Sequence, residues 1–137
     1  MTPMATYHLR IVTPDGQYFN GEAEKLIVRT INGDYCLMAH HINYTTALGM
    51  GMATLVAEGK TRYAACIGGM ISMQDNHATL VASTFEWAED IDLERAKNAA
   101  DRAEAILADS SNRSAREILL AEAALRRALV RQSVGSR

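Results

Sequence analysis

Five charged side chains in the last third of the chain have the types and spacing of an anion-binding site. On helices, Asp92, Arg95 and Arg102 stand at i, i+3 and i+10, and Arg127 and Arg131 stand at i and i+4. In an antiparallel hairpin, Asp92 and Arg95 are expected to meet the last two arginines at the open end. Converging guanidinium groups suit a polyphosphate because they are planar and can bind in bidentate fashion. The alternative is a pair of solvated helix faces with ordinary Asp–Arg and Glu–Arg pairs, and the spacing alone favours it.

Other residue patterns that could form a binding or catalytic site are weaker. Gly59-Lys60-Thr61 resembles the end of a phosphate-binding loop, but the first glycine of that loop is replaced by Thr54, and strand-forming residues flank the tripeptide. The adjacent His40 and His41 cannot face one metal from a strand, since neighbouring side chains point to opposite sides. No carboxylate or cysteine is spaced to complete a zinc site, and no nucleophile is paired with a base. We therefore expect neither a metal site nor an enzyme.

Bulk composition excludes several classes of protein. The 137 residues have a formal net charge of −2, which gives no support to nucleic-acid binding. With 48% hydrophobic and 22% charged residues, a globular protein is expected. The N-terminus lacks a secretory signal pattern, and the uncharged stretch 35–57 contains two histidines that argue against a membrane span. Cys36 and Cys66 have no metal-ligand spacing and are expected to be free thiols in a reducing compartment.

The composition changes at the stretch 91–96. Every aromatic residue lies at or before Trp87, and every glycine except Gly135 lies at or before Gly69. Aromatic and β-branched residues favour strands, whereas the Ala, Leu, Arg and Glu that dominate the later residues favour helices. We expect an all-β sandwich of short antiparallel strands over residues 1–87, followed by an antiparallel two-helix hairpin over residues 88–137.

The expected strands alternate apolar and polar residues or flank turns. Tyr7, Leu9 and Ile11 alternate with polar residues, and turns at 58–60 and 75–77 each join two apolar runs into a hairpin. Short strands with no helix between them indicate a sandwich or barrel. The expected strands are 7–11, 18–19, 25–31, 52–57, 61–67, 70–74 and 78–85, with further turns at 14–16, 20–21 and 32–34.

The residues after Trp87 have the period of two helices. Acidic residues cluster at the start of the first helix, and the segment 109–112 ends it. Ser114 and Glu117 fit the capping box that begins a second helix, which is expected to end near Gln132. The expected buried stripes are Ala96, Ala99 or Ala100, Ala103, Ile106 and Leu107 on the first helix, and Ile118, Ala121, Leu125, Ala128 and Leu129 on the second.

The two helices differ in charge and bury little surface. Residues 86–109 contain eight acids and three bases, for a net charge of −5, whereas residues 112–137 contain six arginines and two glutamates, for +4. Opposite charges favour side-by-side packing, although exposed pairs contribute only about 0.2–1 kcal/mol each. Because small alanine-rich helices bury little apolar surface, the hairpin is expected to be marginally held and able to detach from the sandwich.

Six short motifs occur in a specific order along the chain. They are Leu9-x-Ile11-Val12-Thr13-Pro14, Gly21-x-x-x-x-Leu26, Gly33 followed eight residues later by His41, Gly68-Gly69 before Met70, Ile91-Asp92-x-x-Arg95-Ala96, and the run from Ala121 to Arg131. Each motif alone is weak. In this order, on a sandwich followed by a hairpin, the chain resembles the epsilon subunit of F-type ATP synthases over nearly its whole length.

The resemblance implies a non-catalytic subunit of the central stalk. Family members bind the gamma subunit, rest on the ring of membrane c subunits and help to couple ion flow to rotary ATP synthesis. Their hairpin can extend into the catalytic head of α and β subunits, where it inhibits ATP hydrolysis. The implied location is peripheral, on the cytoplasmic face of a bacterial inner membrane, with membrane contact only through the complex. The resemblance implies no nucleic-acid partner and no required cofactor, with ATP as a regulatory ligand of some members.

The resemblance also implies site residues. Positions that match contacts to gamma are His41 and Thr46, and the position that matches the c-ring contact is Asp34, at the expected turn 32–34. In the members that bind ATP, the folded hairpin uses the Ile-Asp-x-x-Arg-Ala motif and arginines of both helices. The matching residues here are Glu86, Ile91, Asp92, Arg95, Ala96, Arg102, Arg127 and Arg131.

One loop departs from the family pattern, and two other functions remain open. The family pattern has a second glycine and then Leu-Pro-Gly-His-x-Pro, whereas this chain has Cys36 and then the segment 38–43, Met-Ala-His-His-Ile-Asn. This loop is expected to have a different shape. The first alternative function is a free-standing module that senses ATP with its arginines. The second is a β-sandwich adaptor that dimerises through a coiled-coil hairpin, which the two short helices make a poor fit.

Overall fold

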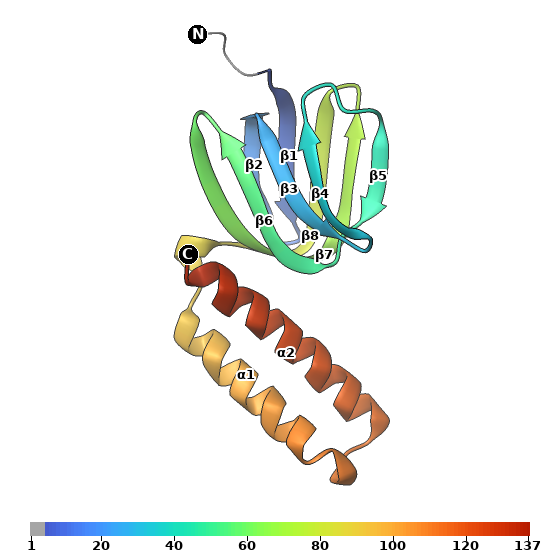
Figure 1. Cartoon of the computed structure of the whole chain (residues 1–137), viewed down its shortest axis with the longest axis vertical. Coiled ribbons are helices and arrows are strands. Elements are labelled where there is room, and N and C mark those ends of the chain that lie inside the picture. Colours follow the sequence, from blue (N-terminus) through green and yellow to red (C-terminus); the bar gives the residue numbers. More distant parts are fainter. Residues whose placement is uncertain (1–4) are drawn as a thin grey trace. The chain divides into compact units, whose positions relative to one another are not determined.

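The computed structural model describes residues 5–137, and the chain divides into two compact units, Met1–Trp87 and Ala88–Arg137. The described residues of the first unit form eight strands, and those of the second form two α-helices, which Figure 1 shows in sequence colours. Within residues 5–137, no helix is both long enough and apolar enough to cross a membrane.

The strands of the first unit follow one hydrogen-bonded path, β2-β1-β8-β7-β6-β3-β4, and β5 pairs with β7. The path folds over at β7 into two layers, as a sandwich requires (Figure 1). Within the described residues, neighbouring strands are antiparallel except β1 with β8, which are parallel, so the predicted antiparallel sandwich is confirmed with one exception. The strands are β1 (Tyr7–Thr13), β2 (Gly16–Ala23), β3 (Lys25–Thr30), β4 (Gly33–Met38), β5 (Tyr44–Ala47), β6 (Met50–Ala57), β7 (Lys60–Gln74) and β8 (His77–Trp87).

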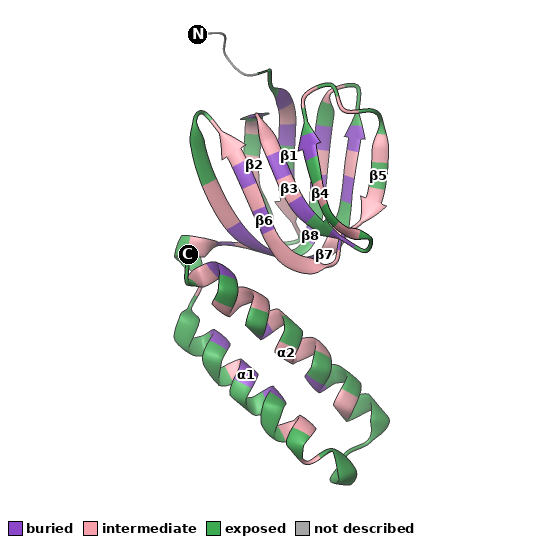
Figure 2. Cartoon of the chain, in the orientation of Figure 1, coloured by how far each residue is buried: buried purple, intermediate pink, exposed green. Residues whose placement is uncertain are grey.

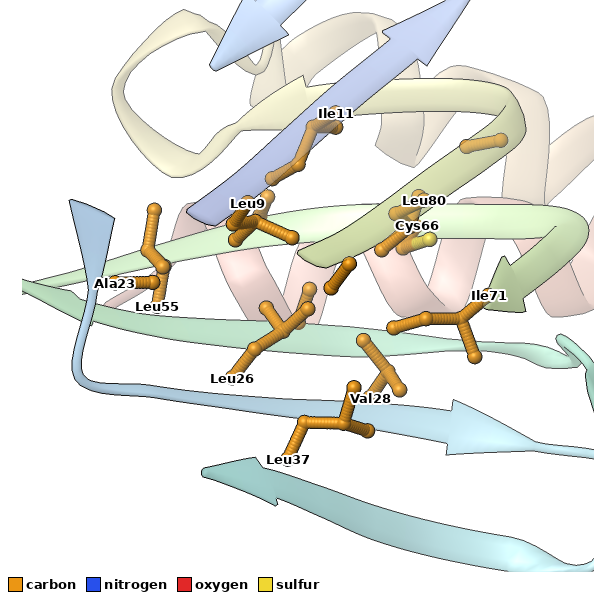
Figure 3. Packing of buried hydrophobic residues seen from close by; sticks show 14 of the residues in the cluster. Leu9, Ile11, Ala23, Leu26, Val28, Leu37, Leu55, Cys66, Ile71 and Leu80 are labelled. Atoms are coloured by element: carbon orange, nitrogen blue, oxygen red, sulfur yellow. The ribbon is translucent and has the colours of Figure 1, made fainter. Parts of the chain in front are cut away.

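The core lies between the two layers and follows from the alternation of side chains along each strand. On β1, Tyr7, Leu9 and Ile11 are fully buried, whereas Arg10 is exposed. Side chains of β3, β4, β6, β7 and β8 converge on the same space, and Figure 3 shows them pointing toward one another. Burying each such aliphatic side chain stabilises the fold by about 1.5–3 kcal/mol. Figure 2 shows the buried positions alternating with intermediate or exposed ones along the strands.

Strand β7 is continuous, whereas the sequence predicted two strands, 61–67 and 70–74. Gly68 and Gly69 have φ of 69° and 112°, and a Cβ on Gly69 would overlap the carbonyl oxygen of Val81. At this point β7 changes one neighbour, because residues 60–67 pair with β6 and residues 70–73 pair with β5. The glycine pair therefore bends the strand without ending it.

One predicted turn is wrong, and the position of another differs from the prediction. Asn20 and Gly21 lie inside β2, where they pair with Arg10 and Leu9 of β1, because the long-range ladder overrides the local turn signal. The turn predicted at 32–34 is shorter, since Gly33 already pairs with Thr30 as the first residue of β4.

The second unit is an antiparallel pair of helices, α1 (Leu93–Ala108) and α2 (Ala115–Gly135), with 3-10 turns at Ala88–Asp90 and Ser110–Asn112. Buried positions of α1 lie on the side that faces α2 (Figure 2). Leu129 was predicted to be buried on α2, but it is 48% exposed. It follows buried Ala128, and one step along a helix rotates the side chain by about 100°. The buried residues are Ala96, Ala100, Ala103, Ala121, Ala128 and Val134.

Both helices begin with side-chain caps. The Asp92 carboxylate accepts the backbone N–H of Arg95 at 3.0 Å. The predicted capping box of α2 is confirmed, since Ser114 Oγ accepts the Glu117 N–H at 3.1 Å and the Glu117 carboxylate accepts the Ser114 N–H at 3.4 Å. The helix extends three residues beyond the predicted end at Gln132, to Gly135.

Candidate functional site

The open end of the hairpin is closed by contact between the end of α2 and the start of α1. A Cβ placed on Gly135 would approach Leu93 Cδ2 to 2.7 Å and Ile91 Cγ2 to 3.1 Å. A side chain at this position would displace the side chains of Leu93 and Ile91. The start of α1 and the end of α2 are therefore neighbours, as the sequence predicted for this end.

Four arginines of the hairpin, Arg95, Arg102, Arg127 and Arg131, share one side of it. Arg95, Arg102 and Arg127 each directly precede an alanine that is buried in the hairpin. In an antiparallel pair of right-handed helices, a residue that directly precedes an interface residue lies on the same side of the pair, whichever helix it belongs to. Arg131, three residues after such an alanine, is rotated toward that side as well. The three alanines are Ala96, Ala103 and Ala128.

Two depressions on the hairpin adjoin at Arg102, which lines both. The first is open and polar, with a volume of about 450 Å³, and its lining is Asp92, Glu94, Arg95, Asn98 and Arg102. The second is an apolar groove of about 380 Å³ between the helices, and its lining is Ala99, Arg102, Ala103, Ile106, Glu117, Leu120, Ala121 and Ala124. Guanidinium groups beside an apolar surface can hold an anionic group and an adjoining flat or apolar one.

Three other residues of the predicted nucleotide site have different surroundings. Ala96 is 3% exposed, so its methyl group packs within the hairpin. Ile91 is half-buried beside Gly135. Glu86 lies in β8, opposite Ala65 of β7, and thus belongs to the first unit.

Asp34 lies in β4 rather than at the tip of a turn. Its carboxylate is 2.8 Å from Nε of Arg29, its cross-strand neighbour on β3, and both side chains are more than half exposed. An exposed pair of this kind contributes about 0–1 kcal/mol, so Asp34 remains accessible to another cation at little cost.

His41 lies in the loop between β4 and β5, within an aromatic cluster. Its Nε2 is 2.6 Å from the Tyr35 hydroxyl, and its Nδ1 is 2.7 Å from the carbonyl oxygen of Ile42. Tyr35 stacks on Tyr44 of β5 with ring centroids 4.7 Å apart and planes at 10°. Thr46 lies two residues further along β5, opposite Ile71, and is half-buried. His41 can therefore present its ring surface, but both ring nitrogens are already engaged.

Sequence reasoning missed the residues that shape this loop. The sequence predicted no role for Tyr35 or Tyr44, and it placed Asn76 only in a turn. Asn76 contacts residues of the loop 36 positions away in the chain, and no local pattern encodes such a contact. Across residues 5–137, the structure contains no group of three or more His, Cys, Asp or Glu side chains able to hold a metal ion.

Comparisons with known proteins agree with this two-part architecture. Residues 6–88 match the model of the ATP synthase delta/epsilon chain β-sandwich domain, and residues 89–134 match that of the delta/epsilon chain long α-helix domain. The ATP synthase epsilon chain of Shouchella clausii (strain KSM-K16) is 37% identical over 131 residues, 96% of each chain. That of Caldanaerobacter subterraneus subsp. tengcongensis is 35% identical and covers 96% of this chain and 95% of the relative.

A solved structure shares the fold. A chain in the cryo-EM structure of the Euglena gracilis mitochondrial ATP synthase, OSCP/F1/c-ring in rotational state 1, superimposes with a TM-score of 0.78 at 20% identity, over 91% of this chain and 79% of that chain.

The sandwich and helical hairpin thus define the class, the delta/epsilon chains of ATP synthases. Within that class, this chain belongs to the ATP synthase epsilon chain family. The predicted family is confirmed, and so is the non-catalytic central-stalk role that goes with it. Because the match extends over 96% of the chain, it favours a stalk subunit over a free-standing sensor.

Proposed function

We propose that this chain is the epsilon subunit of a bacterial F-type ATP synthase, and that it helps to couple ion translocation to rotary ATP synthesis. Its hairpin regulates ATP hydrolysis. The observation that supports this most is the match of both units, in order, to the two domains of one family. The subunit is peripheral and is held at the cytoplasmic face of the inner membrane by the complex alone.

We propose that the sandwich contacts gamma at His41 and Thr46 and the c ring at Asp34. Exposed Asp34, with its weak ion pair, can exchange Arg29 for a basic group of the ring. The helices of the hairpin contact the α and β subunits when the hairpin extends.

Affinity purification of the tagged chain from its own cells tests the stalk assignment. The gamma, α and β subunits are expected to copurify after mild detergent extraction. Their absence, with the chain recovered as a free monomer, would contradict the assignment. Asp34→Lys is expected to weaken retention of the c ring while leaving gamma bound.

We further propose that the arginine-bearing side of the hairpin binds ATP as a regulatory ligand. The phosphates lie against Arg95, Arg102, Arg127 and Arg131, where bidentate contacts to phosphate oxygens are strongest. Two features support this. Arg95 and Arg102 line an open depression, and an apolar groove that can accept a flat ring begins at Arg102.

ATP binding has a direct consequence for the hairpin. Its helices meet largely through alanines, so little apolar surface holds them together. A ligand that binds only the folded hairpin stabilises it by RT ln(1 + [L]/Kd), which is about 2.7 kcal/mol at 100 times Kd. Cellular ATP would thus favour the folded hairpin, and depletion of ATP would favour its extension.

Calorimetric titration of the whole chain with ATP tests this proposal. Arg95→Ala and Arg127→Ala are each expected to weaken binding about tenfold or more, since each removes a charged hydrogen bond. Arg126→Ala is the matched control. Arg126 is exposed, and because it is adjacent to Arg127 on the helix, its side chain points about 100° away from that of Arg127. Absence of binding at millimolar ATP would contradict the proposal that the hairpin binds ATP, and it would not affect the stalk assignment.

A further inference from the structure

Side-chain hydrogen bonds hold the loop 38–43 to the neighbouring turn of β7 and β8. Asn76 Oδ1 accepts the backbone N–H of His40 at 2.7 Å, and Asn76 Nδ2 donates to the carbonyl oxygen of Thr6 at 3.1 Å. Asn43 Oδ1 accepts the backbone N–H of Asp75 at 3.0 Å. Both sides of the loop are thus fastened to the same turn, and the turn is fastened to the segment that leads into β1.

The backbone of this loop has an unusual conformation at His40. Its φ is 63°, in the left-handed region that few residues other than glycine adopt. The bond from Asn76 to the His40 N–H offsets the cost of that conformation. Asn76 therefore determines the path of the loop from outside it.

A second brace acts on His41 inside the loop. A carbonyl oxygen can only accept, so His41 Nδ1 donates to Ile42 O at 2.7 Å, and Nε2 is hydrogen-bonded to the Tyr35 hydroxyl at 2.6 Å. The His41 N–H also donates to Met38 O at 3.3 Å, which closes a turn. The ring of His41 and the backbone on either side of it are therefore fixed.

Ile42 projects from this braced loop. It is 75% exposed, the highest value among the large hydrophobic residues exposed in the described part of the chain, and Met38 in the same loop is 42% exposed. An apolar side chain on a mobile loop must lose conformational entropy on binding, whereas one on a fixed loop loses much less. The loop thus presents an aliphatic side chain beside His41 in a preformed conformation.

We propose that the loop 38–43 is a preformed docking loop for the gamma subunit, with Ile42 as its anchor and Asn76 as the residue that positions it. The inference rests on the proposed assignment of His41 to the gamma contact. It adds that the partner surface offers an apolar pocket for Ile42, next to a patch that covers the His41 ring. Truncation of the Ile42 side chain removes the apolar contact with gamma. Truncation of Asn76 leaves Ile42 and His41 in place but removes the hydrogen bonds that hold the loop.

The affinity of the full chain for purified gamma, measured by biolayer interferometry, tests the proposal. Ile42→Ala is expected to weaken binding about tenfold or more, as truncation of an interface anchor does. Ile31→Ala is the matched control, since Ile31 is 67% exposed at the other turn of β4, and it is expected to change affinity less than about twofold.

Asn76→Ala is expected to weaken binding about fivefold through loss of loop order. Asn76→Asp, which keeps an oxygen for the His40 N–H, is expected to restore most of the affinity. The double variant with Ile42→Ala should bind no more weakly than Ile42→Ala alone, because the positioning acts through the anchor. Amide exchange at His40 and His41 should accelerate in Asn76→Ala and not in Ile42→Ala.

The outcomes separate this inference from the stalk assignment. If the unaltered chain binds gamma and Ile42→Ala binds as tightly as Ile31→Ala, the docking loop is wrong and the stalk assignment stands. If Asn76→Ala weakens binding equally with and without Ile42, the positioning role is wrong. If Asn76→Ala does not fold, Asn43→Ala replaces it, with the same expectations. If the unaltered chain does not bind gamma, both the assignment and the docking loop are wrong.

Discussion

The guanidinium carbon of Arg62 lies 3.6 Å from the centroid of the Trp87 ring. Arg62 lies in β7 and Trp87 ends β8, and the indole also contacts Phe85, with ring centroids 5.0 Å apart at 89°. The indole therefore packs against a cation and an aromatic ring. Because Trp87 is the only tryptophan of the sequence, tryptophan fluorescence reports on the surroundings of this one ring.

Arg62→Ala is expected to lower the free energy of unfolding by about 0.5–2 kcal/mol, the range for a cation over an indole. The emission of Trp87 should also shift to longer wavelength as water reaches the ring. Urea titration followed by tryptophan fluorescence measures both. Arg10→Ala, which removes an exposed arginine of β1, serves as the control and should leave the emission maximum unchanged. Identical curves for the two variants would refute the stabilising contact.

Gly69→Ala is expected to destabilise the sandwich by about 3 kcal/mol, because a methyl group there would overlap Val81 O and the residue has a φ of 112°. Gly59→Ala separates the two causes, since Gly59 has a φ of 73° but open space around its Cβ position. It should cost only about 1–2 kcal/mol. Chemical denaturation of both variants gives the comparison, and equal losses would mean that the close approach at Gly69 contributes nothing.

The two thiols are expected to react at very different rates. Cys36 is exposed, whereas Cys66 is buried in the core, and burial raises the pKa of its thiol to about 12. A disulfide reagent at pH 8 should therefore modify one thiol rapidly and the second only after unfolding in urea. Cys36→Ser should abolish the fast phase. Rapid reaction of that variant would show that the core opens far more often than its packing predicts.

The hairpin is expected to lose stability in acid through Glu117. The hydrogen bond from Arg113, followed by those from Ser114, holds the pKa of Glu117 below its ordinary value. The unfolded chain therefore binds this proton first. The contribution to stability is complete above the ordinary pKa of a glutamate and is lost as pH falls through the lowered one.

Circular dichroism of the helices between pH 7 and pH 3 measures this effect. Glu117→Gln should reduce the stability at neutral pH and flatten the acid dependence, while Glu122→Gln, at an exposed position of the same helix, should do neither. A steep acid loss that persists in Glu117→Gln would assign it to other carboxylates.

Local signals account for what the sequence predicted correctly. The capping box of Ser114 and Glu117 depends on residues three apart, and the helical period depends on residues three and four apart, so both can be read directly. The composition change after Trp87 and the ordered family motifs were equally visible. Among the site residues, the common side of Arg95 and Arg102 followed from their spacing alone.

The features that the sequence did not reveal depend on residues far apart in the chain. Asn20 and Gly21 have the composition of a turn, but the ladder with β1 keeps them in a strand. The parallel pairing of β1 with β8 joins segments nearly seventy residues apart, as in His8 with His77.

The identity and the two-part layout of this protein were therefore determined by its sequence, because propensity, caps and motifs act over a few residues. The shape of the loop 38–43 was decided only by the tertiary structure. Asn76 reaches His40 across 36 residues because folding brings the turn of β7 and β8 beside the loop after β4. A hydrogen bond of this kind requires two backbone segments at one distance and angle, and only the packing of the whole sandwich supplies them.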